Sequence, residues 1–207
     1  GAVAATELER HIAAVHERAG IVPRAPVARP AEPETQERPE AGQGLFAPDI
    51  VDQLNAVFSR MQRPLVLELS LDDGPVSEEL RGYTEAMAAL TDKLSVRVTD
   101  RDEEHRPCVR VCLEDGTWTG LAFHGVPGGH EFTSFVLGLY NASGPGQSVD
   151  PAVMGEISAL GRTDLTILVS LSCTMCPDLV IAAQRIASLN ADVTAQVYDV
   201  SHYPDLR

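Results

Sequence analysis

Two cysteines separated by two residues carry the clearest chemistry in this chain of 207 residues. Cys173 and Cys176 lie between an apolar run at residues 165–171, which predicts a strand, and an amphipathic run at residues 175–189, which predicts a helix. The free N–H groups and the dipole at the start of a helix favour an anion and lower the pKa of a thiol there. The spacing predicts Cys173 as the attacking thiolate. Cys176, one turn further along, is then the thiol that resolves a mixed disulfide. The core-facing stripe of this helix is expected to hold Cys176, Leu179, Val180, Ala183, Ile186 and Ala187.

The same pair leaves two other interpretations open. A single Cys-x-x-Cys can be half of a metal or cluster site that another subunit completes, or the two thiols can be inert core residues. The change from strand to helix across the motif favours redox chemistry. Met175, between the cysteines, is expected on an apolar rim where a partner protein docks.

The other candidate ligands and thiols are expected to be structural. Cys108 and Cys112 are four residues apart in an alternating run that predicts a strand, so they lie about 13 Å apart and cannot form a disulfide. His124 and His130 have no partner at metal-ligand spacing. Trp118 is expected to contribute packing only.

An internal repeat positions the Cys-x-x-Cys motif. Residues 64–71 align with residues 164–171, and residues 94–98 align with residues 193–197. Each copy begins helix, strand, helix, strand, and the strand-helix-strand unit implies parallel strands. The first copy then adds an antiparallel strand pair and a closing helix, which is the order of a thioredoxin-like fold. The expected helices lie at residues 48–61, 77–90, 130–140 and 151–160, and the further strands at residues 65–71, 95–98, 109–113, 119–123 and 193–200.

The repeat also divides the chain. We expect an α/β protein with a first thioredoxin-like fold at residues 45–146 and a second, incomplete one at residues 147–207. Residues 73–76 of the first copy, Asp-Gly-Pro-Val, occupy the position of the Cys-x-x-Cys motif, so only the second copy can exchange disulfides. A helix is expected at residues 1–20, followed at residues 21–44 by a disordered linker that contains five prolines.

Composition excludes several classes of function. The 16 basic residues against 30 acidic ones give a net charge of −14, which opposes binding to nucleic acid. No apolar run approaches the roughly 20 residues of a membrane span, and no basic stretch precedes an apolar one near the start. We therefore expect a cytoplasmic protein that binds neither nucleic acid nor membrane.

Residues from about 45 onward resemble the N-terminal domain of the F subunit of alkyl hydroperoxide reductase, a flavoprotein that reduces a peroxiredoxin. The resemblance is carried by Leu-Ser-Leu-Asp-Asp at residues 69–73, Gly-His-Glu-Phe-Thr-Ser at 129–134 and Ser-Leu-Ser-Cys-Thr-Met-Cys-Pro-Asp at 170–178. In that family the domain is a tandem of two thioredoxin-like folds with the redox pair in the second. The resemblance implies that Cys173 and Cys176 take electrons from a flavin domain and pass them to a C-type peroxiredoxin.

Three further expectations come from the resemblance. Glu131 matches an acidic residue beside the redox pair and could exchange a proton during thiol attack, although an acidic residue at a helix start is also ordinary capping. Pro107 matches the position of a cis-proline. Residues 1–19 resemble the end of a thioredoxin-reductase-type flavoprotein, so FAD and NAD(P)H are expected only in a domain upstream, and the parent protein is expected to be a homodimer.

Together these observations predict the dithiol-disulfide electron-transfer module of an NAD(P)H-dependent peroxiredoxin reductase, an antioxidant function in cell redox homeostasis, with a redox-active disulfide at Cys173 and Cys176. Two alternatives stay open. One is a general thioredoxin-like or glutaredoxin-like protein disulfide reductase. The other is a non-catalytic docking module whose cysteines are structural or bind a metal.

Overall fold

The fold is given by a computed structural model that describes residues 44–206. The helix expected at residues 1–20 and nearly all of the linker expected at residues 21–44 lie outside the described residues. Among the described residues, no helix is both long and apolar enough to cross a membrane.

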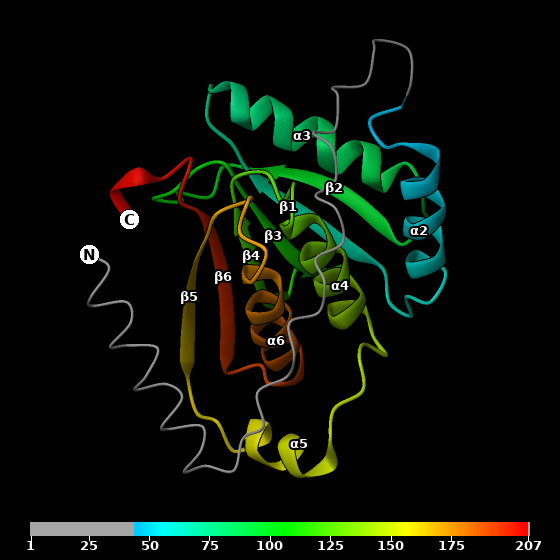
Figure 1. The fold of residues 1–207 in the computed structure, drawn as a ribbon, viewed down its shortest axis with the longest axis vertical. Coiled ribbons are helices and arrows are strands. Elements are labelled where there is room, and N and C mark those ends of the chain that lie inside the picture. Colours follow the sequence, from blue (N-terminus) through cyan, green and yellow to red (C-terminus); the bar gives the residue numbers. More distant parts are fainter. Residues whose placement is uncertain (1–43, 207) are drawn as a thin grey trace, which may run out of the picture. The chain divides into compact units, whose positions relative to one another are not determined.

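A single sheet of six strands forms the centre of the molecule, in the order β2-β1-β3-β4-β6-β5 (Figure 1). Strand β1 pairs with β2 in parallel and with β3 antiparallel, and β3 pairs antiparallel with β4. The second copy contributes β5 and β6, which are parallel. The strands are β1 (Leu65–Ser70), β2 (Leu94–Thr99), β3 (Cys108–Leu113), β4 (Trp118–His124), β5 (Thr163–Val169) and β6 (Val193–Asp199).

The two copies are joined edge to edge by β4 and β6, which pair in parallel. Gly120 of β4 makes this contact possible, because its φ is +87° and a Cβ at this position would lie 2.6 Å from the carbonyl oxygen of Val193. The repeat therefore builds one continuous sheet from two thioredoxin-like halves.

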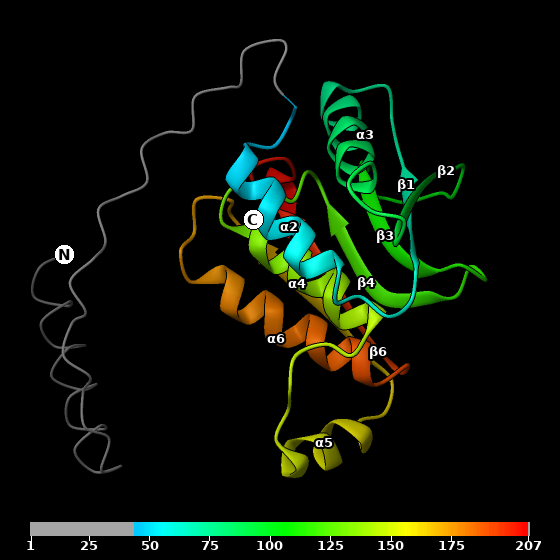
Figure 2. The same cartoon turned by 90° about the vertical axis from the view of Figure 1, so that its right-hand side faces the viewer.

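The helices lie close to the positions that the sequence predicts. They are α2 (Pro48–Phe58), α3 (Pro75–Ala88), α4 (Glu131–Ser143), α5 (Pro151–Ser158) and α6 (Cys176–Leu189), followed by a 3-10 turn, η1 (Pro204–Leu206). Helices α4 and α6 pack against each other and against β4, on one face of the sheet (Figure 2). Helix α4 belongs to the first copy and α6 to the second, so the two copies share one helical layer as well.

The register of the strands explains which face these helices cover. One row of side chains crosses five strands and is apolar throughout, and every member is buried. The adjacent row faces the other way and is largely polar. The apolar row contains Leu69, Val109, Phe123, Val197 and Ile167, and the polar row contains Glu68, Arg110, Ala122, Gln196 and Thr166. Both copies consequently contribute to one hydrophobic core.

The elements expected within residues 44–206 are all present, with ends that differ by a few residues. Cys108 and Cys112 are buried free thiols in β3, as predicted. One core residue was predicted wrongly: Leu179 is 61% exposed. The buried stripe of α6 runs through Val180, Ala183, Gln184 and Ala187, and Leu179 lies about 100° off it, one position before Val180.

Candidate active site

The Cys-x-x-Cys motif lies in a tight turn between β5 and α6. Cys173 and Cys176 form a disulfide with their Cα atoms 5.6 Å apart. The backbone N–H of Cys173 donates to the carbonyl of Ser170 at 2.8 Å, which turns the chain back immediately after β5. Both cysteines are partly exposed, and Cys176 also packs against the core. The pair is thus placed where another thiol can reach it.

The start of α6 differs from the prediction. The helix begins at Cys176, with Met175 as its N-cap, so Cys173 precedes the first helical residue by three positions. The hydrogen bond to Ser170 holds Cys173 in the turn instead. Pro177 follows as the second helical residue, where the missing N–H costs nothing because the first turn has no helical acceptor for it. The free N–H groups of this first turn still favour negative charge near the sulfurs.

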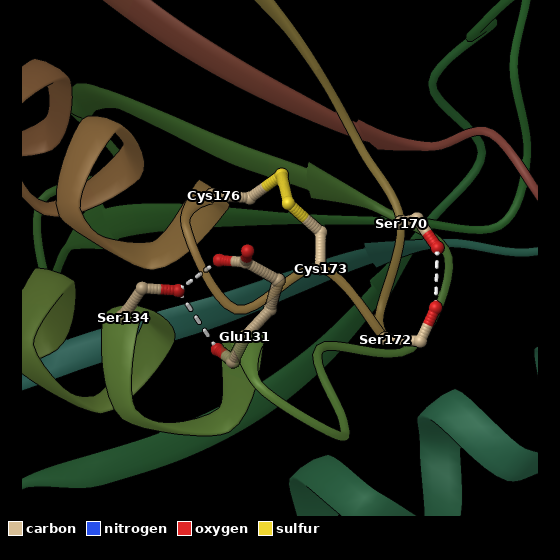
Figure 3. Close-up of a disulfide and its surroundings, with 6 residues drawn as sticks. All are labelled: Glu131, Ser134, Ser170, Ser172, Cys173 and Cys176. Atoms are coloured by element: carbon tan, nitrogen blue, oxygen red, sulfur yellow. Dashed lines mark hydrogen bonds between the residues drawn. A yellow bond between two sulfur atoms is a disulfide. The ribbon is translucent and has the colours of Figure 1, made fainter. Parts of the chain in front are cut away.

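Glu131 brings a carboxyl group to the disulfide from the first copy. It is the first residue of α4, its side chain is fully buried, and its carboxyl group points toward the disulfide (Figure 3). The Ser134 hydroxyl donates to Glu131 Oε2, and Oε1 has no hydrogen-bond partner among the described residues. Burial raises the pKa of Glu131, opposed by the Ser134 hydrogen bond and the charge of His130. The side chain is enclosed by the protein at the start of α4, and its role stays a prediction.

The backbone ties the two halves of the site together. The N–H of His130 donates to the carbonyl of Leu171 at 3.0 Å, which links the start of α4 to the turn before Cys173. Gly129 has a φ of +54°, and a Cβ on it would lie 2.6 Å from the same carbonyl oxygen. The close approach therefore needs glycine, and it fixes Glu131 relative to the disulfide.

Two large apolar side chains are exposed in the segment that holds the disulfide. Met175 is 74% exposed and Leu179 is 61% exposed, and both belong to the turn and first helical turn that hold the cysteines. Large apolar side chains at this exposure next to a reactive group are typical of a docking rim. The expected placement of Met175 is thus seen, and its role stays a prediction.

Three further residues that the sequence singled out are His124, His130 and Trp118. His124 is buried in β4, where its Nδ1–H donates to the His105 carbonyl at 2.7 Å and its ring stacks on Tyr198. Burial lowers the pKa of His124. His130 is exposed, and Trp118 packs under the guanidinium of Arg110. Within residues 44–206 no group of three or more His, Cys, Asp and Glu side chains is arranged to hold a metal ion.

The first copy contains the expected cis-proline. The peptide bond between Arg106 and Pro107 is cis, and the carbonyl of Pro107 accepts a hydrogen bond from the Tyr203 hydroxyl at 3.0 Å.

In the first copy, the turn that corresponds to the Cys-x-x-Cys motif is held by Asp72. Its carboxylate accepts from the Gly74 N–H at 2.8 Å and from the Ser77 hydroxyl at 2.6 Å.

Comparison with known proteins gives consistent relatives, although no protein-family model matches the sequence. Over 154 residues the chain is 34% identical to the alkyl hydroperoxide reductase F subunit of Pseudomonas aeruginosa, and the match covers 74% of this chain and 29% of that protein. Over 156 residues it is 31% identical to a Bacillus subtilis protein named NADH dehydrogenase, covering 75% of this chain and 30% of that protein. A solved structure of the Enterococcus faecalis alkylhydroperoxide reductase F subunit matches with a TM-score of 0.75 and 34% identity, covering 78% of this chain and 83% of that one.

The chain belongs to the family of the F subunit of alkyl hydroperoxide reductase. The predicted resemblance and the tandem thioredoxin-like α/β fold are confirmed. The chain spans about three tenths of the length of the curated alkyl hydroperoxide reductase relatives that it matches. Its described residues include the disulfide and the carboxyl group beside it.

Sequence reasoning missed two features of the site. It did not find Ser134, although the Glu-x-x-Ser spacing within Gly-His-Glu-Phe-Thr-Ser places both side chains on one side of a helix. It also did not find the backbone contact of Gly129 and His130 with Leu171. That contact joins residues about forty positions apart, and no local pattern signals it.

Proposed function

We propose that this chain carries the dithiol-disulfide relay of a peroxiredoxin reductase. The observation that carries the proposal is the position of the Cys173–Cys176 disulfide, in an exposed turn before a helix and beside the buried carboxyl group of Glu131. Membership of the alkyl hydroperoxide reductase family supports it. A disulfide that must open and close needs access for partner thiols and a group that exchanges a proton with the leaving sulfur.

In the first half-reaction a dithiol donor reduces the disulfide. A donor thiolate attacks one sulfur of the pair, the Cys173–Cys176 bond breaks, and Cys176 leaves as a thiolate that takes the proton of the Glu131 carboxyl group. The second donor thiol then loses its proton to solvent, attacks the mixed disulfide as a thiolate and releases Cys173 as a thiolate. The donor leaves as a disulfide, having supplied two electrons to the pair.

In the second half-reaction Cys173 attacks the disulfide of the acceptor and forms a mixed disulfide, and one acceptor sulfur leaves as a thiolate. The Glu131 carboxylate removes the proton from Cys176, which attacks Cys173 and expels the second acceptor sulfur. The intramolecular disulfide forms again, and the acceptor has gained two electrons. The proton taken up by Glu131 is the one that it gives to Cys176 in the next reduction.

The partners follow from the family. We propose a C-type peroxiredoxin as the acceptor and, as the donor, a flavoprotein domain upstream of this chain that uses FAD and NAD(P)H. The names alkyl hydroperoxide reductase and NADH dehydrogenase among the relatives support this source of electrons. Residues 1–20 would then close the flavoprotein domain and residues 21–44 would tether the relay to it, which raises the effective concentration of the disulfide at the flavin. We further propose a cytoplasmic homodimer for the parent protein.

Peroxide-dependent NAD(P)H oxidation by the parent protein with its peroxiredoxin tests the proposal. Cys173→Ser should reduce turnover to background, since Cys176 alone cannot form the disulfide and the other two cysteines of the described residues are buried. Cys112→Ala is the matched control because Cys112 is a buried thiol in β3, and it should keep turnover near that of the unmodified protein. Undiminished turnover in Cys173→Ser would reject the relay.

The exposed Met175 and Leu179 favour one second candidate, a general protein disulfide reductase, because an apolar rim can accept more than one partner. A competition experiment separates the two functions. If an unrelated disulfide protein is reduced as fast as the peroxiredoxin, the acceptor is general. If the reduced pair reacts slowly and uniformly with an alkylating reagent, or if a chelator changes its protection, a docking or metal-binding module is indicated instead.

A further inference from the structure

Ser134 is a buried hydroxyl group whose hydrogen-bond acceptors among the described residues both belong to Glu131, the proposed proton carrier. It lies one turn after Glu131 on α4 and is fully buried. Its Oγ lies 2.9 Å from the backbone carbonyl oxygen of Glu131 and also contacts Oε2 of the Glu131 carboxyl group. A serine hydroxyl has one proton, so it can donate to only one of these two oxygens at a time.

The two acceptors correspond to the two protonation states of Glu131. When the carboxyl group is protonated, its own O–H can donate to Ser134 Oγ, and the serine proton is free to bond the helix carbonyl. When the carboxyl group is ionised, the serine proton turns to Oε2 and forms a charge-assisted hydrogen bond. No side chain has to move between the two states, because Oγ already contacts both oxygens.

The other carboxyl oxygen is the one available for chemistry. Oε1 is buried without a hydrogen-bond partner among residues 44–206, and Figure 3 shows that the carboxyl group lies between Ser134 and the disulfide. A buried oxygen without a hydrogen-bond partner lowers the stability of the fold, so its presence here calls for a functional explanation. Ser134 occupies Oε2 and so leaves Oε1 on the side of the sulfurs.

We infer that Ser134 is a positioning residue for Glu131: its hydroxyl holds Oε2 and presents Oε1 to Cys176 for proton exchange. This inference rests on the proposed exchange between Glu131 and Cys176. The proton moves from the Cys176 thiol to Oε1 as the Cys176 sulfur attacks Cys173, and it returns when that bond is reduced. The serine proton stays on Oγ throughout and changes only its acceptor.

Among the described residues, few charged or titratable groups surround Glu131, so a change in its pKa can be traced to Ser134. His130, which precedes it at the start of α4, lowers the pKa of Glu131 by its charge, and burial raises it. From the turn and α6, the titratable groups that face it are the two cysteines, while Asp178 in the first turn of α6 is exposed. Because the Ser134 hydrogen bond lowers the pKa of Glu131, removing it should raise that pKa.

The test follows the reduced full chain as it reacts with dipyridyl disulfide. Cys173 releases the first pyridinethione and the attack of Cys176 releases the second, so the second phase reports the proton removed from Cys176. Its rate should rise with pH as Glu131 ionises. In Ser134→Ala the midpoint should move up by roughly one pH unit, so that the second phase is about tenfold slower below the midpoint, with the plateau unchanged.

Two variants separate this role from a structural one. Ser143→Ala removes another fully buried hydroxyl from α4, one that bonds Arg63, and it should leave the midpoint unchanged even if the protein is less stable. Ser134→Thr keeps the hydroxyl and should keep the midpoint of the unmodified chain. An unshifted midpoint in Ser134→Ala, or an equal shift in Ser143→Ala, would overturn the inference.

Two further measurements keep the result decisive. If Ser134→Ala does not fold, the unmodified chain can be studied by NMR. The chemical shifts of the Glu131 carboxyl carbon and of the Ser134 Cβ should then titrate with one shared midpoint. Independent midpoints would refute the inference. Glu131→Gln should abolish the pH dependence of the second phase. If it does not, the proposed role of Glu131 fails; if it does while Ser134→Ala leaves the midpoint in place, only the role of Ser134 fails.

Discussion

The same turn occurs twice in this molecule, and the two copies hold it in different ways. In the first copy the turn before α3 is closed by the Asp72 carboxylate, which accepts hydrogen bonds from Gly74 and Ser77. In the second copy the turn before α6 is closed by the disulfide between Cys173 and Cys176. The hydrogen bonds of the first turn do not depend on the redox state, whereas the disulfide of the second turn breaks when it is reduced by two electrons. One architecture therefore supplies a structural copy and a reactive copy.

The two copies also differ in how their first strands are covered. Strand β1 lies between β2 and β3, and all six of its residues are buried. Strand β5 is the corresponding strand of the second copy and lies at the edge of the sheet, where exposed residues alternate with partly buried or buried ones. The first copy thus contributes a strand buried throughout, while the reactive turn follows an edge strand and stays accessible.

The copies are nevertheless coupled through one core, and Phe123 is the residue whose removal should show this most strongly. It is fully buried in β4, with its ring edge against Phe135, and it pairs across strands with Val109 in one copy and Val197 in the other. Phe123→Ala should lower the free energy of unfolding by about 4 kcal/mol. Chemical denaturation followed by Trp118 fluorescence, with hydrogen exchange of the β6 amides, measures both copies.

Both probes should report one transition with the same loss. Phe132→Ala, on the same helix as Phe135 but only partly buried, should cost clearly less. Two separate transitions, or β6 amides whose protection is unchanged, would show that the copies are independent domains.

The carboxyl group supplied by the first copy should have the next largest effect. Glu131→Gln keeps the shape of the side chain but cannot exchange a proton, so it should slow the resolving attack of Cys176 about 100-fold. Rapid-mixing kinetics of the reduced chain with dipyridyl disulfide measures this step. Glu156→Gln, at an exposed position of α5, is the matched control and should change nothing.

The same substitution should alter stability with a definite sign. Burial raises the pKa of Glu131 above its ordinary value of 4.5, so the folded protein binds more protons than the unfolded chain above that pH. Stability due to this group is therefore lost as pH rises from 4.5 through the raised pKa. Glu131→Gln should remove that loss, and equal pH profiles for both proteins would contradict the assignment.

The apolar rim should affect partner recognition more than folding. Leu179→Ser, at an exposed position, should change the free energy of unfolding by less than about 0.5 kcal/mol. It should slow the reaction with an oxidised peroxiredoxin about tenfold while the reaction with dipyridyl disulfide stays the same. Val153→Ser on α5 is the control, because Val153 is also an exposed apolar residue and lies far from the cysteines in sequence; it should affect neither. A parallel loss with both disulfides would mean that Leu179 acts on the cysteines and not on docking.

The smallest effect concerns His124, the last residue of β4. Burial lowers the pKa of His124 below its ordinary value of 6.5, so the unfolded chain binds a proton more readily than the folded protein. The free energy of unfolding should therefore fall as pH decreases from 6.5 toward the lowered pKa. Denaturant titrations at several pH values should show this slope, and His124→Gln should flatten it. A slope that survives the substitution would assign it to other groups.

Much of the fold could be predicted from the sequence because each strand, turn or helix pattern in the repeat occurs in both copies. The apolar run of β1 and that of β5 support one another, and the turns at Asp72 and at Cys173 fall at the same point of each copy. The start of α6 was placed too early, since periodicity does not distinguish a tight turn from the first turn of a helix. Leu179 was misplaced for a related reason, because one residue of error in the phase of a helix rotates a side chain by about 100°.

The site was predictable only in part. The cysteines carry their own signal, and Glu131 was found through its family resemblance. The contacts that bring them together could not be read from the chain, because two helices and a strand separate His130 from Leu171 in the sequence. The burial of Glu131 is likewise a property of packing between copies and not of the residues around it.

Trapping of the mixed disulfide tests the central claim most directly. The reduced full chain carrying Cys176→Ser is mixed with an oxidised peroxiredoxin, and the adduct is digested and analysed by mass spectrometry. Because the resolving thiol is absent, we predict a stable intermolecular disulfide that contains Cys173. No adduct at all, or an adduct through Cys108 or Cys112, would contradict the account.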